Sequence, residues 1–447
     1  MNPKYASIDF ASLDKRRKMH IIFPVFLVSV IAFLDLVNIA YAGMTMSQQL
    51  TWLTPEIFGA GAGMFFLGYF FFEIPGSLIA AKFDACKWIA RIMFTWGIVC
   101  GLLAFMTSEF QFFLFRFLLG ACEASLYPVI YAVLFPRWFL AKERAAAISL
   151  MLTSLLIAAI IGAPVAGFLL ELNIFGFHGW QCLFLIEAVP ALVFTFVFLF
   201  WVKDRPDKAM WLTPLEKEYL NETIAAEEKA KENVKKYTIW QSLTDKQVWR
   251  LCIIYFTWIT GFWGFNFWMP QVLKGLSGWS PALVGVAIIF PMGAALIAQI
   301  LIGNSSSRTG EKRWHIAGCM FLGAFGLICA PFIHTGILSL VFISLTAIGV
   351  YAAMGTWWSV PTTFLSGAAA AGATALINSV ANLGGYLGPF MLGVIKQNTG
   401  STDMGYFALG AMLIVSGLVM LTLPKKTAVE LGQQEKEQAD TGSMAEQ

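Results

Sequence analysis

Charged residues are scarce in this chain: Asp, Glu, Lys and Arg make up 13% of its 447 residues, about half of their share in an average soluble domain. Hydrophobic residues make up 58%, and the mean hydropathy is +0.70. So few charges cannot cover the surface of a soluble protein of this size. The composition therefore excludes an ordinary soluble globular protein and predicts one that is solvated mainly by lipid.

The residue patterns of enzymes and metal sites are also missing. The seven cysteines include no CxxC pair and no histidine at ligand spacing, so neither disulfides nor a metal site are indicated. The sequence contains no nucleophile elbow, phosphate loop, HExxH motif or Gly-rich dinucleotide turn after a strand. The net charge of +3 is not gathered on a basic soluble face. We predict no enzyme activity, no cofactor, no metal and no nucleic-acid partner.

Long apolar runs are what the chain has instead. Each is about 20 residues long, which is the length that crosses a bilayer as a helix. They are too long and too uniformly apolar to be barrel strands of about 10 alternating residues. About twelve such runs occur, at roughly 20–41, 57–80, 88–107, 110–135, 145–170, 180–201, 249–273, 281–303, 315–334, 338–363, 373–396 and 405–423. The predicted fold class is an all-α polytopic membrane protein with twelve transmembrane helices.

Lysine and arginine indicate how these helices are oriented. If the N-terminus is inside, every basic residue except Lys274, Lys396 and Arg116 lies on the inner side, as the positive-inside rule requires. The cluster from Lys15 to Lys18 precedes a full-length first span without a small-residue cleavage site, so we expect that span to be retained. The N- and C-termini are therefore predicted to be cytoplasmic.

One long polar insert, from Lys203 to Gln247, divides the chain into two halves of similar size. Within it, Thr213 and Glu216 fit a capping box with Pro214 at the first helical position, which predicts a surface helix to about Lys236. The Lys-Trp pair at 87–88 resembles the Arg-Trp pair at 313–314. This faint similarity between the halves is typical of a two-fold internal repeat. The predicted parts are a cytoplasmic N-terminus (1–19), two pseudo-symmetric six-helix bundles (20–201 and 248–424), a linker with the surface helix (202–247) and a disordered cytoplasmic tail (425–447).

A few ionisable residues lie inside the predicted spans, where charge is disfavoured and usually marks function. Asp35 interrupts an apolar first span. Arg116 and Glu123 are two helical turns apart in the fourth span, so they project from one face. The functional hypothesis is that Asp35 and Glu123 exchange protons and that Arg116 is their electrostatic partner. The alternative is a buried ion pair that only holds helices together.

Other polar residues within the spans have different expected roles. Glu73 and Glu187 lie nearer the predicted helix ends, and we expect both to be structural, pairing with loop cations or capping helices. The substrate-binding candidates are the polar and aromatic residues within the spans that could line a pocket: Asn38, Tyr41, Tyr69, Tyr127, Asn266, Gln299, Trp357, Asn378 and Asn382.

Several segments resemble one known family, the major facilitator superfamily (MFS), and within it the anion:cation symporters such as the tartrate, phthalate, allantoate and 4-hydroxyphenylacetate permeases. The resemblance covers nearly the whole chain. It rests on FLDLVNIAYAG (33–43), FEIPGSLI (72–79), KWIARIMFTWG (87–97), FRFLLGACEASLYPVIY (115–131), GWQCLFLIEAVPA (179–191), RPDKAMWLTPLEKEYL (205–220), NFWMPQVLKG (266–275), RTGEKRWHIAG (308–318) and the stretch 361–393. It implies the MFS fold, a bacterial inner-membrane location and proton coupling through Asp35 and Glu123.

The chain departs from that family at positions that bear on the substrate. The family usually has Arg after the first-helix Asp, where this chain has Leu36. The loop after the second span has Asp84 and Cys86 where Gly and Arg are usual, and its counterpart in the second half has Ser307 where Asp is usual. Without the first-helix Arg, the chain lacks the bidentate anion clamp that would contact a substrate carboxylate.

These observations together predict a monomeric secondary transporter whose partners are the lipid bilayer, protons and a small organic acid or zwitterion, imported by alternating access. One alternative is an exporter or antiporter, although the Gly-Pro pattern of drug antiporters is only partly echoed at Gly162, Pro164 and Gly167. The other is a membrane sensor without transport, which would need a signalling domain that the short tails do not supply.

Overall fold

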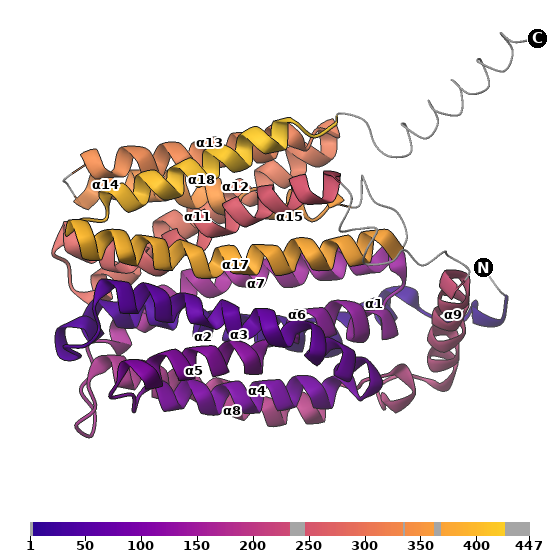
Figure 1. Cartoon of the computed structure of the whole chain (residues 1–447). Helices are drawn as coiled ribbons and strands as arrows, with labels where there is room; N and C mark the ends of the chain where they lie inside the picture. The colour runs from indigo at the N-terminus through magenta and orange to yellow at the C-terminus, as the bar shows by residue number, and fades with distance from the viewer. Residues whose placement is uncertain (1–2, 233–245, 334–335, 362–367, 425–447) are drawn as a thin grey trace, which may run out of the picture.

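A computed structural model describes residues 3–232, 246–333, 336–361 and 368–424, and in these ranges the chain is helical apart from turns and one isolated bridge between Ile174 and Phe177 (Figure 1). Eleven of the described helices are long and apolar enough to cross a membrane. A further long helix, α17, lies alongside them. The described residues thus give the helical membrane fold that the apolar runs predict.

The N-terminal half contains six long helices. Three of them begin at a side-chain cap, as when Thr54 accepts from the backbone N–H of Ile57, which satisfies an otherwise unpaired donor. The long helices are α2 (Phe23–Gln49), α3 (Pro55–Lys82), α4 (Ala85–Leu103), α5 (Glu109–Glu123), α7 (Ala141–Leu169) and α8 (Gly179–Trp201). Shorter elements are η1 (Pro3–Tyr5), α1 (Phe10–Arg17), η2 (Lys18–Ile22), α6 (Leu126–Val129), η3 (Ile130–Leu134), η4 (Phe135–Arg137) and η5 (Pro206–Lys208).

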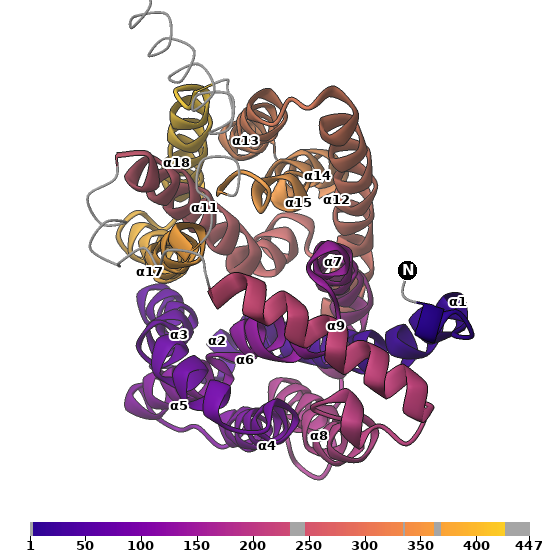
Figure 2. The same ribbon diagram turned by 90° about the vertical axis from the view of Figure 1, so that its right-hand side faces the viewer.

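The C-terminal half repeats this organisation. Its long helices are α11 (Lys246–Ser277), α12 (Pro281–Thr309), α13 (Arg313–Cys329), α14 (Gly336–Tyr351), α17 (Ala368–Thr399) and α18 (Asp403–Leu421), with the short η6 (Ala330–Phe332) and α15 (Met354–Trp357). Viewed along the helix axes, the two halves form two bundles that face each other (Figure 2).

Two helix pairs make most of the contact between the bundles: α3 packs along α17, and α7 packs along α12. Small residues permit the close approach, because a Cβ at Gly59 would collide with the carbonyl of Pro389 and one at Gly285 with the carbonyl of Ala163. Close packing through small residues is a common way for helices to associate in lipid. The bundles are therefore in backbone contact at these crossings.

The end of the molecule away from α1 and α9, here called the distal end, is also joined by hydrogen bonds between the bundles. Lys274 Nζ donates to the carbonyl of Met44 at 2.7 Å, and the backbone N–H of Ala282 donates to Glu171 Oε1 at 3.1 Å. Phe58 and Trp268 pack edge to face across the same interface, with ring centroids 5.1 Å apart. The two bundles are thus held together at the distal end.

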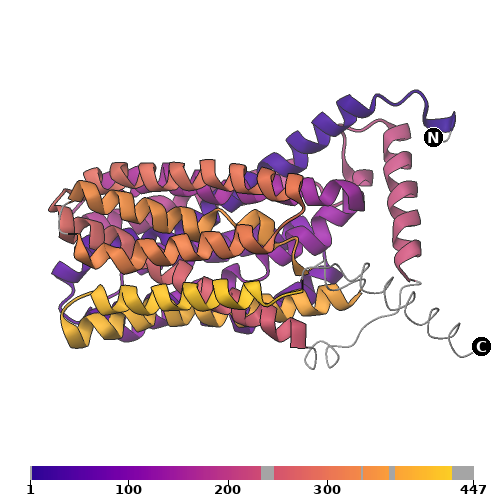
Figure 3. The ribbon, with the colours of Figure 1, turned by 90° about the horizontal axis from the view of Figure 1, so that it is seen from above.

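The linker helix α9 (Pro214–Glu232) lies across the other end of the molecule, here called the α9 end (Figure 3). Thr213 and Glu216 form the reciprocal capping bonds that the sequence predicts. Ion pairs hold α9 to the N-terminal half: Arg16 with Glu216, and Arg144 with Glu227 at 2.9 Å. The predicted extension of this helix beyond residue 232 and the tail predicted to be disordered, 425–447, lie outside the described residues.

Candidate functional site

Asp35 lies at the centre of a polar cluster inside the N-terminal bundle. Its side chain on α2 is 0% exposed. From α4, Trp96 Nε1 donates to Oδ2 at 2.7 Å and Cys100 Sγ donates to Oδ1 at 3.6 Å, while Asn38 Nδ2 contacts the same sulfur at 3.5 Å. These donors are all neutral, and no Lys or Arg of the described chain forms an ion pair with Asp35. The carboxylate faces its own bundle rather than the C-terminal bundle.

Glu187 on α8 joins this cluster, which the sequence did not predict. Its side chain is buried and lies within electrostatic range of Asp35. No loop cation of the described residues pairs with it, so the expected role as a capping or loop-pairing residue is wrong. The packing of α8 against both α2 and α4 brings this second carboxylate toward the first.

Arg116 is buried, but it does not form the expected contact with Glu123. Its Nε and Nη2 donate to the backbone carbonyls of Gly61 and Ala62 on α3, at 3.3 and 3.1 Å. The guanidinium also lies over two aromatic rings, 5.5 Å from that of Phe65 and 5.9 Å from that of Phe267 on the opposite bundle. The seven-residue spacing correctly places Arg116 and Glu123 on one buried side of α5, yet Arg116 binds the backbone of α3. Its charge reaches Glu123 through space only.

Glu123 ends α5 directly before a break in the fourth span. Ser125 has a left-handed backbone with φ of 74°, a conformation that is strained for a residue with a side chain and often marks a functional position. Glu123 Oε2 has no hydrogen-bond partner among the described residues, and the carboxylate lies within electrostatic range of Asp35. A buried carboxylate with an unpaired oxygen beside a helix break fits a group that changes partners.

Glu73 connects the two bundles, so the expectation that it is a capping or loop-pairing residue is also wrong. It lies in the second half of α3 with its side chain buried. Asn378 Nδ2 donates to Oε1 at 2.9 Å, and Asn382 Nδ2 donates to Oε2 at 3.1 Å. Both asparagines belong to α17. The structure thus brings two of the substrate-binding candidates to a carboxylate instead of leaving them free in a pocket.

The remaining substrate-binding candidates divide between the interface and the bundle interiors. Tyr69 lies within electrostatic range of Glu73 and Glu123. Trp357 is stacked on Tyr255 with ring centroids 5.1 Å apart, and its indole N–H has no partner among the described residues. These residues remain candidates for substrate contact.

Two other candidates, Tyr127 and Asn266, are hydrogen-bonded within one bundle. Tyr127 exchanges a hydrogen bond with Ser29 at 3.2 Å, and Asn266 Oδ1 accepts from the hydroxyl of Tyr351 at 2.7 Å. Tyr41 is buried within electrostatic range of Glu187, whereas Gln299 is half-buried on α12. Tyr127 and Asn266 therefore have hydrogen-bond partners within their own bundles, and a substrate role for all four residues stays a prediction.

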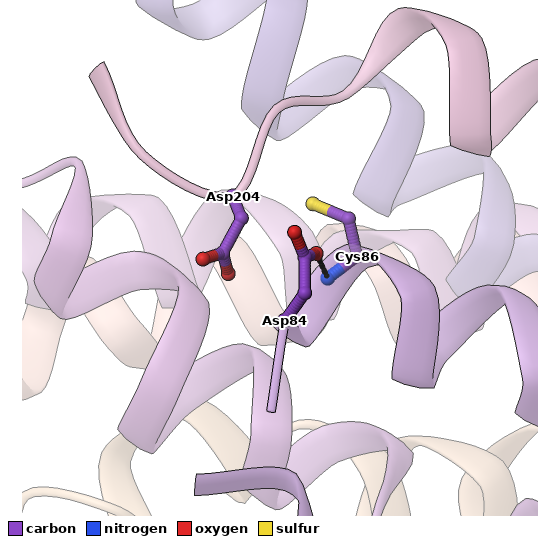
Figure 4. Close-up of side chains that lie close together, drawn as sticks. All are labelled: Asp84, Cys86 and Asp204. Carbon is purple, nitrogen blue, oxygen red and sulfur yellow. Dashed lines mark hydrogen bonds between the residues drawn. The ribbon is translucent and has the colours of Figure 1, made fainter. Parts of the chain in front are cut away.

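A second cluster of chemistry-bearing side chains lies at the α9 end. Ligand atoms of Asp84, Cys86 and Asp204 lie within 4.8 Å of one another (Figure 4). Both carboxylates already have cationic partners, however: Lys208 bonds to Asp84 at 2.9 Å and Arg137 pairs with Asp204. Burial would raise the pKa of Asp84, but the hydrogen bond and charge of Lys208 and backbone N–H donors lower it overall. We therefore interpret the cluster as a charge network that ties the loop after α8 to the start of α4.

Comparison with known proteins identifies the family to which this chain belongs. The family model described as Major Facilitator Superfamily matches residues 25–389. In structure, the inward-open xylose transporter XylE from E. coli aligns over 93% of this chain and 99% of its own, with a TM-score of 0.72 at 15% identity. The chain belongs to the major facilitator superfamily, and it is a multi-pass membrane transport protein rather than an enzyme.

Individual relatives indicate which members of the superfamily this chain is similar to. A protein of Agrobacterium vitis named "Putative tartrate transporter" is 41% identical over 398 residues, covering 89% of this chain and 88% of the relative. The "Quinolone resistance transporter" of Acinetobacter baumannii is 32% identical over 392 residues, covering 87% and 89%. The first of these relatives agrees with the resemblance to anion:cation symporters seen in the sequence motifs.

Proposed function

We propose that this protein is a proton-coupled importer of a small organic acid or zwitterion and that Asp35 and Glu123 are the residues that exchange protons. The observation that carries the proposal is the setting of Asp35, a fully buried carboxylate whose hydrogen-bond donors are neutral. A lone charge in such a site is costly. Its protonation is therefore easily linked to a change of conformation that alters its exposure to water.

Glu123 on α5 supports the same mechanism. The two carboxylates lie within electrostatic range, so a charge on one favours the neutral form of the other,. Arg116, the electrostatic partner, lies within electrostatic range of Glu123. One proton shared by this group in one conformation and released in the other would couple transport to a proton gradient.

The substrate class follows from the supply of positive charge. Arg116 is the one basic residue predicted from sequence to lie at membrane depth, and its guanidinium already binds two backbone carbonyls. Leu36 stands where the resembled family usually has Arg, so this second cation is missing. A dianion would carry an uncompensated charge in a low-dielectric site, so we propose a solute with at most one net negative charge and an apolar or aromatic body. The tartrate-named relative supports an organic acid as the general class.

The proposed orientation places the α9 end in the cytoplasm of a bacterial cell, with the protein working as a monomer in the inner membrane. The basic residues gathered near that end support this orientation,. The bundle contacts at the distal end would then close the outward side, and import would end with release toward α9. The name of the quinolone-resistance relative keeps export of a small organic solute as the alternative direction.

Counterflow into proteoliposomes tests these proposals directly. Vesicles preloaded with one compound from a panel of organic acids, amino acids and neutral solutes would be mixed with its radiolabelled form, and labelled uptake would be recorded with and without an imposed pH gradient. We expect exchange of a monoanion or zwitterion and its accumulation when the outside is acidic. Accumulation only when the gradient is reversed would favour the exporter, and exchange of no compound by a folded protein would contradict transport of these solutes.

A further inference from the structure

Glu73 is a buried carboxylate that the proposed Asp35 and Glu123 mechanism does not use. Its side chain is 8% exposed, and each of its two oxygens accepts one amide N–H from the opposite bundle. The donors, Asn378 and Asn382, are four residues apart on α17, so they project from one face of that helix. A carboxylate with both oxygens bonded to a pair of matched donors is a built site rather than an accidental contact.

The position of this contact differs from that of the distal contacts. Glu73 is 18 residues beyond Pro55 in α3, which is about 27 Å along the helix. In each hydrogen bond described above at the distal end, one of the two partners is a backbone group, as when Lys274 donates to the carbonyl of Met44. Glu73 instead joins side chains of both bundles between the middle of α3 and its α9 end. Movement of one bundle against the other, which alternating access requires, must bend or break this contact.

The strength of the contact depends on the proton of Glu73. A charged carboxylate accepts two charge-assisted hydrogen bonds, which are about twice as strong as neutral ones. A protonated carboxyl group is a neutral and weaker acceptor that also carries an O–H donor, and one of the two amides can accept from that donor only if it rotates to offer its oxygen. Protonation of Glu73 therefore changes the free energy that holds α3 against α17.

The groups around Glu73 do not fix its charge, so that charge depends on the hydrogen bonds from Asn378 and Asn382. Tyr69 on α3 and Tyr255 on α11 lie within electrostatic range of it, and Glu123 on α5 acts on the same Tyr69. No Lys or Arg of the described residues forms an ion pair with Glu73. Arg116 binds α3 at Gly61, 12 residues earlier and about 18 Å away along the helix.

We propose that Glu73 is a second coupling carboxylate of the transport cycle and that the amides of Asn378 and Asn382 transmit its protonation state to the C-terminal bundle. Asp35 cannot serve this role directly, because the hydrogen bonds described for it lie within its own bundle. The inference rests on the proposed proton coupling. It adds the step by which loss or gain of a proton in one bundle alters its attachment to the other.

A distance measurement tests the proposal without knowledge of the solute. Spin labels would be introduced through noncanonical amino acids at Thr51 and Asn398, two exposed distal positions on opposite bundles, and the inter-label distance would be measured in nanodiscs from pH 5.5 to 8.5. In the unmodified background we expect the populations of close and separated distal ends to change with pH. In Glu73→Gln we expect that change to shrink at least threefold. Glu56→Gln, the same change at an exposed position of the same helix, should behave like the background.

Two further variants keep the result interpretable if Glu73→Gln folds poorly. Asn378→Ser with Asn382→Ser retains the carboxylate but shortens both donors, and it should also reduce the pH response. Glu73→Gln combined with Asn382→Glu moves the carboxylate to α17 and should restore the response. A pH response that is absent from the background, or unchanged in Glu73→Gln, would overturn the proposal. So would a transposed pair that folds but leaves the response suppressed.

The result of the distance measurement can be distinguished from a failure of the proposed function. If Asp35→Asn still accumulates solute while Glu73→Gln loses the pH-dependent distance change, the assignment of Asp35 fails and that of Glu73 stands. If Glu73→Gln instead weakens exchange of amine-bearing solutes alone and leaves the distances pH-dependent, Glu73 is a substrate counter-ion and the coupling role is refuted.

Discussion

The two bundles have the same helical organisation but differ in what they bury. Asp35, Glu73, Arg116, Glu123 and Glu187 are buried within the N-terminal bundle, whereas the buried polar side chains of the C-terminal bundle in the described residues are neutral. Since a buried ionisable residue in lipid is kept at a cost, the difference indicates a division of labour. In the proposed mechanism the N-terminal bundle carries the groups that exchange protons, and the C-terminal bundle supplies the surfaces that respond.

Some buried polar groups of the C-terminal bundle bond to backbone carbonyls of the same bundle. Trp258 Nε1 donates to the carbonyl of Val350 at 2.9 Å, and Ser416 Oγ donates to that of Ile254 at 2.9 Å. Such bonds do not change with pH. The amides of Asn378 and Asn382 instead contact a carboxylate of the other bundle. The asymmetry between the bundles can be tested by substitution.

The largest effect is expected for Asp35→Asn, which removes the charge but keeps the shape of the side chain. We expect accumulation driven by a pH gradient to disappear while counterflow remains measurable, because exchange needs no net proton movement. Ser416→Ala, which deletes a buried polar group from the other bundle, is the matched control and should accumulate solute like the unmodified protein. Full accumulation by Asp35→Asn would remove it from the coupling mechanism.

A smaller effect, on stability, is expected from Arg116. Arg116→Gln loses two charge-assisted bonds to the carbonyls of Gly61 and Ala62, and we expect a loss of about 3 kcal/mol. Glu123 is not its bonding partner but feels its charge through space, so the coupling free energy between Arg116→Gln and Glu123→Gln should be well below the roughly 3–5 kcal/mol that breaking a bonded buried pair costs. Thermal and denaturant unfolding of both single variants and the double variant would measure it. A double variant more stable than Arg116→Gln alone would show that the two residues form a pair.

Substrate preference should respond to Leu36→Arg, which adds the cation that the sequence lacks beside Asp35. We expect the ratio of dicarboxylate to monocarboxylate exchange to rise on the order of tenfold, or about 1.4 kcal/mol of binding preference. Leu36→Met is the uncharged control. Tight binding of tartrate or phthalate by the unmodified protein, measured by calorimetry at neutral pH, would show that the site already accommodates a dianion.

The smallest effect concerns the ion pairs at the α9 end of the N-terminal bundle. Burial would raise the pKa of Glu143, but its hydrogen bond and charge interaction with Arg17, 2.9 Å away, lower it overall. A carboxylate whose folded-state pKa is depressed stabilises the fold above its unfolded value of about 4.3 and loses that contribution as the pH falls through the folded pKa. The pair is partly exposed, so its contribution is below about 1 kcal/mol.

Glu143→Gln should therefore lower the melting temperature slightly at pH 7 and leave it unchanged well below pH 4. The acid-induced loss of stability between these values should be smaller in the variant than in the unmodified protein. Differential scanning measurements over this range would check the prediction. An equal acid-induced loss in both proteins would show that the Arg17 pair does not contribute.

The sequence by itself determined the fold class and the positions of most spans. The hydropathy of about 20 consecutive residues decides whether they can cross a bilayer as a helix, and this is a local property of the sequence. It also located Asp35, Arg116 and Glu123 as buried ionisable residues. The capping residues Thr213 and Glu216 predicted the start of α9, since reciprocal capping acts over one helical turn. In each case the physical cause lies within a short stretch of chain.

Only the tertiary structure decided which partners these residues have. Asn378 is 305 residues from Glu73, and nothing local to the sequence of either helix specifies that α3 and α17 meet at this register. Arg116 was likewise expected to pair with Glu123, but the close approach of α3 offers it two backbone carbonyls that stabilise the guanidinium. Hydropathy selects which side chains are buried, whereas helix packing selects what each of them contacts.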